Sequence, residues 1–164
     1  MQALASAADL TTGAFYSQFG GKPELLAAII DHELGRTLGW FDDASPASLK
    51  QALSRYLSDW HVAHPAQGCA IPSLAAEVGR ADVATREVFE SRMVALQQAM
   101  ARGLGDDAAA WALLCQAAGG VLVARAFADP ARAADVLASV RRQALLAVDA
   151  LTAAAPDAGN EPAP

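Results

Sequence analysis

The side chains that could bind a metal ion or act in catalysis gather in one short stretch. His61 and His64 are three residues apart, and Cys69 follows five residues later. Imidazole nitrogens and thiolate sulfurs are preferred ligands of Zn²⁺, but three loosely spaced ligands on both sides of Pro65 are weak evidence for a site. We therefore expect no metal. We expect His61 and His64 to be partly exposed residues at a helix end, where a positive charge suits the helix dipole.

Catalytic motifs are absent from the sequence. It contains no GxSxG, HExxH, GxGxxG or phosphate-binding loop, and no Glu-x-x-His pair of the kind found in di-iron bundles. We expect neither enzymatic activity nor a cofactor, although a small helical enzyme that uses an apolar pocket stays open as an alternative. Cys69 and Cys115 form no CxxC and are typical of reduced thiols in a cytoplasmic protein.

Composition indicates an all-α protein. Of the 164 residues 54% are apolar, and helix formers such as Ala, Leu, Arg, Gln and Glu outnumber strand formers. The net charge of −6 argues against a general nucleic-acid coat but allows one small DNA-reading face. We expect no membrane span, since no apolar run approaches the roughly 20 uncharged residues that one needs, and no secretory signal is visible. We expect a cytoplasmic protein without a membrane partner.

Capping residues and apolar stripes divide the chain into helices. A first long helix follows Pro23. Ser45 caps a helix that Pro46 begins and that continues to His64, before the residue ahead of Pro65 leaves helical angles. The remaining expected helices are a short one near Ser73–Arg80, one capped by Asp82 that ends around Gly103–Gly105, one capped by Asp106 or Asp107, and a last one after Asp129-Pro130. Residues 153–164 have too few apolar side chains to pack and are expected to be disordered.

The larger helical part, residues 39–152, contains side chains that could line an apolar pocket. Each candidate residue, taken alone, is more often a plain core residue than a ligand contact. The candidates are Tyr56, Trp60, Phe89, Met93, Trp111 and Cys115. Gly119-Gly120 within a helix lowers helix stability by about 1 kcal/mol per glycine, which suggests the close approach of another helix. Arg125, near an apolar helix end, could face either an interface or water.

Large aromatic side chains are concentrated near the start, in "DLTTGAFYSQFGGKPELL". Residues 2–18 can form two short helices, with Asp9-Leu10 as the turn between them and Thr11 as the cap of the second. Phe15 and Phe19 lie on one face of that second helix and give a small unit apolar area to bury. Two short helices joined by a tight turn form a helix-turn-helix, which places its second helix in the DNA major groove.

The stretch "ALASAADLTTGAFYSQFGGKPELLAAI" resembles the DNA-binding signature of the tetracycline-repressor family of regulators. The matching positions cover more than twenty residues with fixed spacing. They are Leu4-Ala5, Ala8, Leu10, Thr11, Gly13, Phe15, Tyr16, Phe19, Lys22 and Leu25. The rest of the chain is similar to the family's helical effector domain more loosely, best in "GCAIPSLAAEVGR" and the final helix pair.

The resemblance implies a ligand-responsive transcriptional repressor that binds double-stranded operator DNA as a homodimer. Residues 1–38 would form the helix-turn-helix region with its connecting helix, and residues 39–152 would bind a small apolar effector and dimerise through the last two long helices. Phosphate contacts would set the register on DNA, and base contacts the sequence preference. By position, the phosphate contacts are Thr11, Tyr16 and Lys22, the base-facing residues are Thr12, Gly13 and Ala14, and Gln18 replaces a histidine while keeping hydrogen-bonding ability.

Two features of the sequence support a second interpretation, whereas Asp9, which stands where the turn glycine is usual, can still adopt the left-handed conformation. The helix that precedes the motif in the family has no counterpart in this sequence, so either the protein begins further upstream or this form is compromised for DNA. Lys22 is the one Lys or Arg among residues 1–35, and affinity for DNA rises with the number of phosphates neutralised. The alternative is therefore a shortened ligand-binding and dimerisation module with little DNA affinity.

Overall fold

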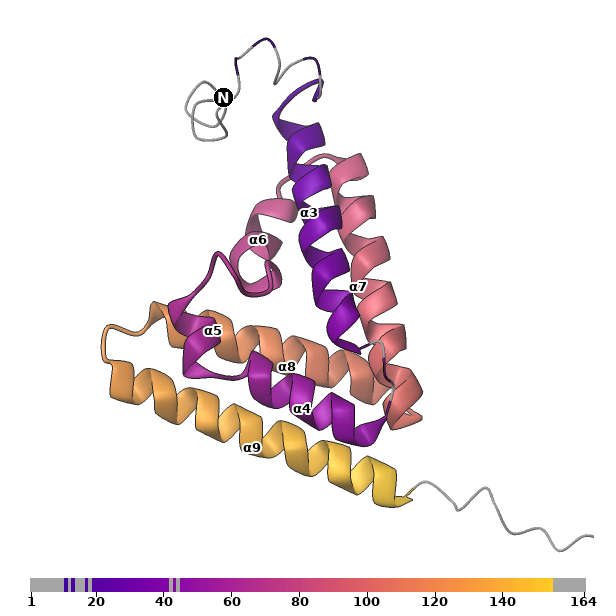
Figure 1. Ribbon diagram of the computed structural model, residues 1–164, viewed down its shortest axis with the longest axis vertical. Coiled ribbons are helices and arrows are strands. Elements are labelled where there is room, and N and C mark those ends of the chain that lie inside the picture. The colour runs from indigo at the N-terminus through magenta and orange to yellow at the C-terminus, as the bar shows by residue number, and fades with distance from the viewer. Residues whose placement is uncertain are drawn as a thin grey trace, which may run out of the picture.

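The computed structural model describes residues 11, 13, 17, 19–41, 43 and 45–154. Within these residues the secondary structure is helical and contains no strand, so the expected all-α class is confirmed. The helices form two groups (Figure 1): an upright pair and a base layer that lies across its lower end.

The upright pair consists of α3 (Lys22–Leu38) and α7 (Val83–Leu104), which run in the same direction side by side. Pro23 stands in the first turn of α3, as the sequence predicts. On the surface, Asp31 and Arg92 join the two helices through an ion pair of 2.7 Å. Ile30 and Leu34 of α3 are almost fully buried, so apolar packing and not this exposed pair holds the helices together.

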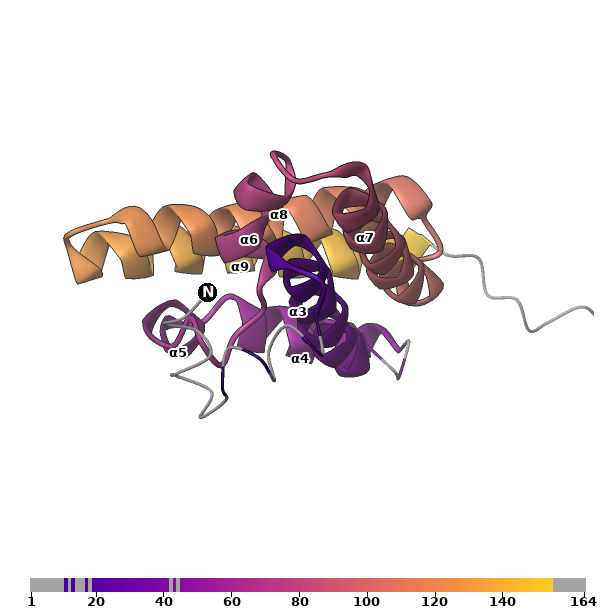
Figure 2. The same ribbon diagram turned by 90° about the horizontal axis from the view of Figure 1, so that it is seen from above.

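The base layer contains α4 (Pro46–Tyr56), α8 (Asp107–Ala126) and α9 (Pro130–Ala154), seen from above in Figure 2. A short 3-10 turn, η1 (Gly39–Phe41), connects the upright α3 to this layer. Two short helices, α5 (Asp59–Ala63) and α6 (Ile71–Val78), return the chain from the layer to the top of α7. The core lies where the two groups meet, and its fully buried side chains include Leu53, Leu57, Leu96, Met100 and Val121.

Three helix starts agree with the capping residues read from the sequence. The Ser45 hydroxyl accepts a hydrogen bond from the Ser48 amide at 3.2 Å. The Asp82 carboxylate accepts from the Thr85 amide at 2.7 Å, and the Asp106 carboxylate from the Ala109 amide at 2.9 Å. Each bond satisfies an amide that has no partner within its helix. At the other end of α7, Gly105 takes a left-handed conformation with φ of 70°, which a residue with a Cβ adopts less readily.

The expectation of one continuous helix from Pro46 to His64 is wrong. The chain leaves helical geometry at Leu57, and Ser58 caps the new helix α5 by accepting from the His61 amide at 3.3 Å. Tyr56 and Leu57 before the break and His61 after it are buried, whereas Trp60 and His64, which the predicted stripe included, are exposed. Periodicity alone therefore could not show where one helix ends and the next begins.

Helix α8 is the most apolar element of the base layer. Its length and composition would allow it to cross a membrane, and 39% of its apolar stretch is buried within the structure. The expectation that no apolar run approaches that length is therefore wrong. One side of the helix packs closely on α9. A Cβ on Gly120 would lie 3.0 Å from Val140 Cγ1, which confirms the close helix approach expected at the glycine pair, whereas a Cβ on Gly119 would meet nothing within 4 Å.

Much of the predicted helix-turn-helix lies outside the described residues. Of residues 2–18, the structure describes Thr11, Gly13 and Ser17, and the backbone is helical at Gly13 and Ser17. At the other end, α9 continues to Ala154, two residues into the predicted tail. Residues 155–164 of that tail lie outside the described part.

Candidate functional site

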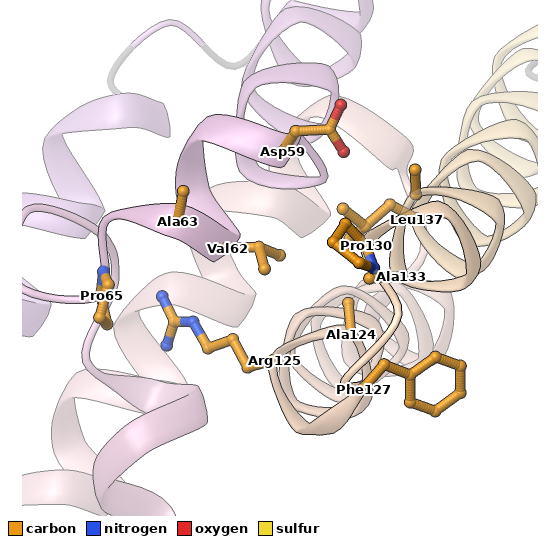
Figure 3. A pocket seen from close by; sticks show the side chains of 11 residues that line it. Asp59, Val62, Ala63, Pro65, Ala124, Arg125, Phe127, Pro130, Ala133 and Leu137 are labelled. Carbon is orange, nitrogen blue, oxygen red and sulfur yellow. The ribbon is translucent and has the colours of Figure 1, made fainter.

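A cavity opens where the end of α8 and the start of α9 meet α5. It has a volume of about 740 Å³, and Figure 3 shows that side chains of these three helices and of the loops beside them surround it. Its lining residues are Asp59, Val62, Ala63, Pro65, Ala124, Arg125, Phe127, Pro130, Ala133, Ala134 and Leu137. Its size and its mainly apolar walls are typical of a small-molecule site.

Arg125 is the one positively charged residue among those lining side chains. Its Nη1 donates a hydrogen bond to the Ser73 hydroxyl at 3.0 Å, and its Nη2 donates to the His61 carbonyl at 2.9 Å. Its Nε is buried and has no hydrogen-bond acceptor among the described residues. Burial lowers the pKa of Arg125, and the nearby Tyr56 and Cys69 oppose that shift. The guanidinium is thus fixed by two neutral oxygens and keeps unused N–H donors.

His61 lies beneath Arg125, 1% exposed. Its Nδ1 is 2.6 Å from the Tyr56 carbonyl, and its Nε2 is 2.9 Å from the Cys69 amide, which can only donate. Nε2 is therefore the acceptor and Nδ1 carries the proton, so the ring is a neutral imidazole. Burial lowers the pKa of His61, the Tyr56 carbonyl opposes this, and the positive charge of Arg125 lowers it further. The expectation of a partly exposed, cationic His61 is wrong.

The loop around Gly68 packs closely against the His61 ring. A Cβ on Gly68 would lie 2.0 Å from His61 Cδ2, so no larger residue fits without moving a ring that two hydrogen bonds hold. The ring of Tyr56 meets the His61 ring edge to face at a centroid distance of 4.5 Å. Burial, together with the neighbouring Cys69, raises the pKa of Tyr56 well above 10, so its hydroxyl stays protonated. These contacts hold the His61 ring in one orientation next to the Arg125 guanidinium.

Helix α6 links this region to the start of α3. Ser73, in its first turn, accepts the hydrogen bond from Arg125. Four residues later, Glu77 lies 3.5 Å from the ammonium group of Lys22, the first residue of α3. Both charged groups of this ion pair are exposed, so the pair itself contributes little to stability. It does, however, connect the predicted phosphate-contacting Lys22 to α6, the helix that carries the hydrogen-bond partner of Arg125.

The structure does not bring the six predicted ligand-binding residues together at the cavity. Tyr56 is buried in the core and lies under the His61 ring. Phe89 and Met93 pack on the core from α7. Trp60, Trp111 and Cys115 are exposed, with Trp60 stacked on His64. None of the six lines the 740 Å³ cavity, because aromatic size and helical periodicity do not reveal where helix ends diverge to leave space.

The predicted DNA-binding residues are only partly described. Thr11 and Gly13 are exposed, and Lys22 is 70% exposed beside Glu77. Thr12, Ala14, Tyr16 and Gln18 lie outside the described residues. The prediction that this segment reads DNA therefore stays a prediction.

The three candidate metal ligands, His61, His64 and Cys69, make contacts within the protein instead of meeting at one site. Both ring nitrogens of His61 bind backbone groups, and the Cys69 thiol lies 3.5 Å from the Ile71 amide. The ring of His64 stacks on Trp60 at the surface, with its Nδ1 2.8 Å from the Trp60 carbonyl. Over the part of the chain that the structure describes, no three His, Cys, Asp or Glu side chains come together to hold an ion.

Sequence reasoning missed most of the residues that form the cavity. The sequence allows Arg125 to face either an interface or water, and the structure shows that it donates hydrogen bonds to Ser73 and His61. A signal was available: Arg125 is a lone charge in the last turn of an apolar helix, ahead of Phe127 and Asp129-Pro130. A charge retained in such a place has either a buried partner or a ligand. Val62 and Leu137 gave no signal beyond membership of an apolar stripe.

By its fold and its site, the protein belongs to the class of all-α proteins with a mainly apolar pocket at one end of a helical bundle. Comparison with protein-family models and with curated proteins finds no match.

Proposed function

We propose that the protein is a ligand-responsive transcriptional repressor that binds operator DNA as a homodimer. The observation that carries the proposal is the spacing of Thr11, Gly13, Tyr16 and Lys22, which resembles the DNA-binding signature of the tetracycline-repressor family. In this proposal the helix that begins at Thr11 enters the major groove and Lys22 neutralises a phosphate.

The arrangement of the bundle supports coupling between a ligand and DNA. The cavity contains Arg125, α6 contacts Arg125 through Ser73, and the same helix contacts Lys22 through Glu77. A ligand that favours one position of α6 would change the population of dimers whose two recognition helices match successive major grooves. Ligand and DNA would then weaken each other's binding reciprocally.

An exposed apolar stripe on α8 supports the homodimer. Trp111, Cys115 and Leu122 follow one another along the side of the helix that α9 does not cover, and Leu122 is 54% exposed. On α9, Leu146 is 55% exposed. Large apolar side chains in such a row are more typical of a subunit interface than of a solvated surface. A second copy of the chain would cover them in a self-complementary four-helix arrangement.

DNA binding can be tested by fluorescence anisotropy with duplexes selected from a random pool by the purified protein. We expect specific binding that weakens steeply between two salt concentrations, because binding releases counterions from the phosphates. The Lys22→Gln variant should bind all sequences more weakly and lower the salt slope by about one per subunit.

Lys50→Gln is the matched control. Lys50 pairs with Asp149 at 2.7 Å in the base layer, far from the start of α3 (Figure 1), so its loss should leave DNA binding unchanged. Binding that shows no sequence preference and no salt dependence would reject the repressor. It would favour the alternative from the sequence, a ligand-binding and dimerisation module with little affinity for DNA.

A further inference from the structure

Among the residues that the structure describes, no opposite charge balances that of Arg125. Its two hydrogen-bond acceptors, the Ser73 hydroxyl and the His61 carbonyl, are neutral. Within the described residues, the groups that act on its pKa are Tyr56 and Cys69, and no carboxylate is among them. A half-buried cation without an opposite charge is costly, since burial removes the water that would otherwise solvate it.

The position of Asp59 leaves that charge unbalanced. Asp59 also lines the cavity, but Val62 lies between it and the Arg125 guanidinium (Figure 3). The cavity therefore has a positive end, formed by Arg125 beside Ala63 and Pro65, and apolar walls formed by Val62, Ala133 and Leu137. A ligand that complements both features has an acidic group at one end and a hydrocarbon or aromatic body at the other.

We propose that this cavity binds an amphipathic organic anion, a carboxylate or sulfonate on an apolar body, with its acidic group on Arg125. The unused N–H donors of the guanidinium, including the buried Nε–H, receive the acidic oxygens, and the apolar body lies between α5 and α9. The inference rests on the proposed function in one respect: this anion is the effector of the repressor. It narrows the expected small apolar effector to one that carries a negative charge.

Two fluorescent probes with the same ring system test the charge requirement. The anion 1-anilinonaphthalene-8-sulfonate and the neutral N-phenyl-1-naphthylamine differ by one sulfonate, and both brighten in an apolar site. Titrated into the whole protein without DNA, the anion should bind at least about tenfold more tightly, because a charge-assisted hydrogen bond is stronger than a neutral one. Equal affinities, or tighter binding of the neutral probe, would overturn the proposal.

Variants then assign the binding to this cavity. Arg125→Gln should weaken binding of the anion about tenfold or more and change binding of the neutral probe less than about twofold. Arg141→Gln, at an exposed position on α9 outside the cavity lining, is the matched control and should leave both probes unaffected. Unchanged binding of the anion to Arg125→Gln would contradict the proposal, since the charge that recognises it would then lie elsewhere.

Ala134→Phe provides an independent test should Arg125→Gln fail to fold. Ala134 lines the cavity and is only partly buried, so a phenyl ring there fills space without entering the core. Both probes should lose affinity. Undiminished binding of the anion in this variant would overturn the cavity as its site. These titrations contain no DNA, so they can fail while the repressor stands, and operator binding can fail while the anion site stands.

Discussion

At the scale of single residues, His61 shows how a titratable side chain can serve as a fixed structural part. Its neutral ring donates to the Tyr56 carbonyl and accepts from the Cys69 amide, so one imidazole joins the end of α4 to the loop that leads into α6. Protonation would place an N–H on Nε2 directly opposite the Cys69 N–H. The ring can therefore carry a positive charge only after the loop has moved away.

This arrangement predicts that the protein loses stability as the pH falls from 7.5 to 5. The pKa of His61 in the folded protein is below its ordinary value of 6.5. Between these two pKa values the unfolded chain binds the proton and the folded protein does not, so acid favours unfolding. The stabilisation is complete above pH 6.5 and is lost as the pH falls toward the folded pKa. The slope cannot exceed about 1.4 kcal/mol per pH unit for one proton. Urea unfolding at a series of pH values measures it.

Two substitutions separate this effect from other titrations. His61→Gln should give a protein of lower stability that no longer depends on pH in this window, whereas His64→Gln, at an exposed position, should keep the wild-type dependence. Asp43 and Asp82 also have lowered pKa values, but both are ionised in folded and unfolded chains above pH 5. A flat wild-type profile would show that His61 does not control this stability.

At the scale of elements, the packing of α8 on α9 depends on one glycine of an adjacent pair. Gly120 faces Val140 and Leu57, whose nearest methyl groups would lie 3.0 and 3.3 Å from an added Cβ. Gly119 points to open space. The two positions share a helix and a residue type and differ in what surrounds them.

We predict opposite effects of alanine at these two positions. Gly119→Ala should stabilise the protein by up to about 1 kcal/mol, because alanine is the better helix former. Gly120→Ala gains the same propensity but must push Val140 and the buried Leu57 apart, which costs about 1–3 kcal/mol. Its free energy of unfolding should fall below that of wild type. Equal stabilisation by both substitutions, measured by urea unfolding at low protein concentration, would mean that the contact is looser than the structure has it.

The sequence predicted those parts of the helical arrangement that depend on nearby residues. The caps at Ser45, Asp82 and Asp106 each bond an amide three residues ahead, so their effect is visible in a window of four residues. The break at Leu57 was not predictable in this way. The Tyr56 carbonyl accepts a hydrogen bond from the His61 ring, and the amide of Cys69, which lies beyond the end of α5, donates to the other nitrogen of that ring. The cavity at Arg125 likewise arises where separate helices diverge.

At the scale of the whole molecule, the exposed face of α8 predicts a dimer. The chain has a mass of 16.9 kDa, and sedimentation should give twice that value at micromolar concentration. Leu122→Glu should shift the protein to a monomer, because a buried, unpaired carboxylate in the interface would be strongly unfavourable.

Val83→Glu is the matched control for this prediction. Val83 is 59% exposed at the start of α7, close to the 54% of Leu122, and it lies away from the α8 stripe. Its substitution should leave the mass unchanged. If the wild type sediments as a monomer, or if both variants dissociate alike, α8 is not the interface and its open side needs another partner.

The contact of α4 with α9 has a consequence for the order in which the chain can fold as it is made. Lys50 and Asp149, which join these helices at 2.7 Å, are 99 residues apart in sequence. At ribosomal rates of about 5–20 residues per second, α4 waits roughly 5–20 s before its partner has been synthesised. During that interval the side of α4 that packs on α9 has no final neighbour, so the nascent protein is most prone to aggregate, or to need a chaperone, just before α9 is synthesised.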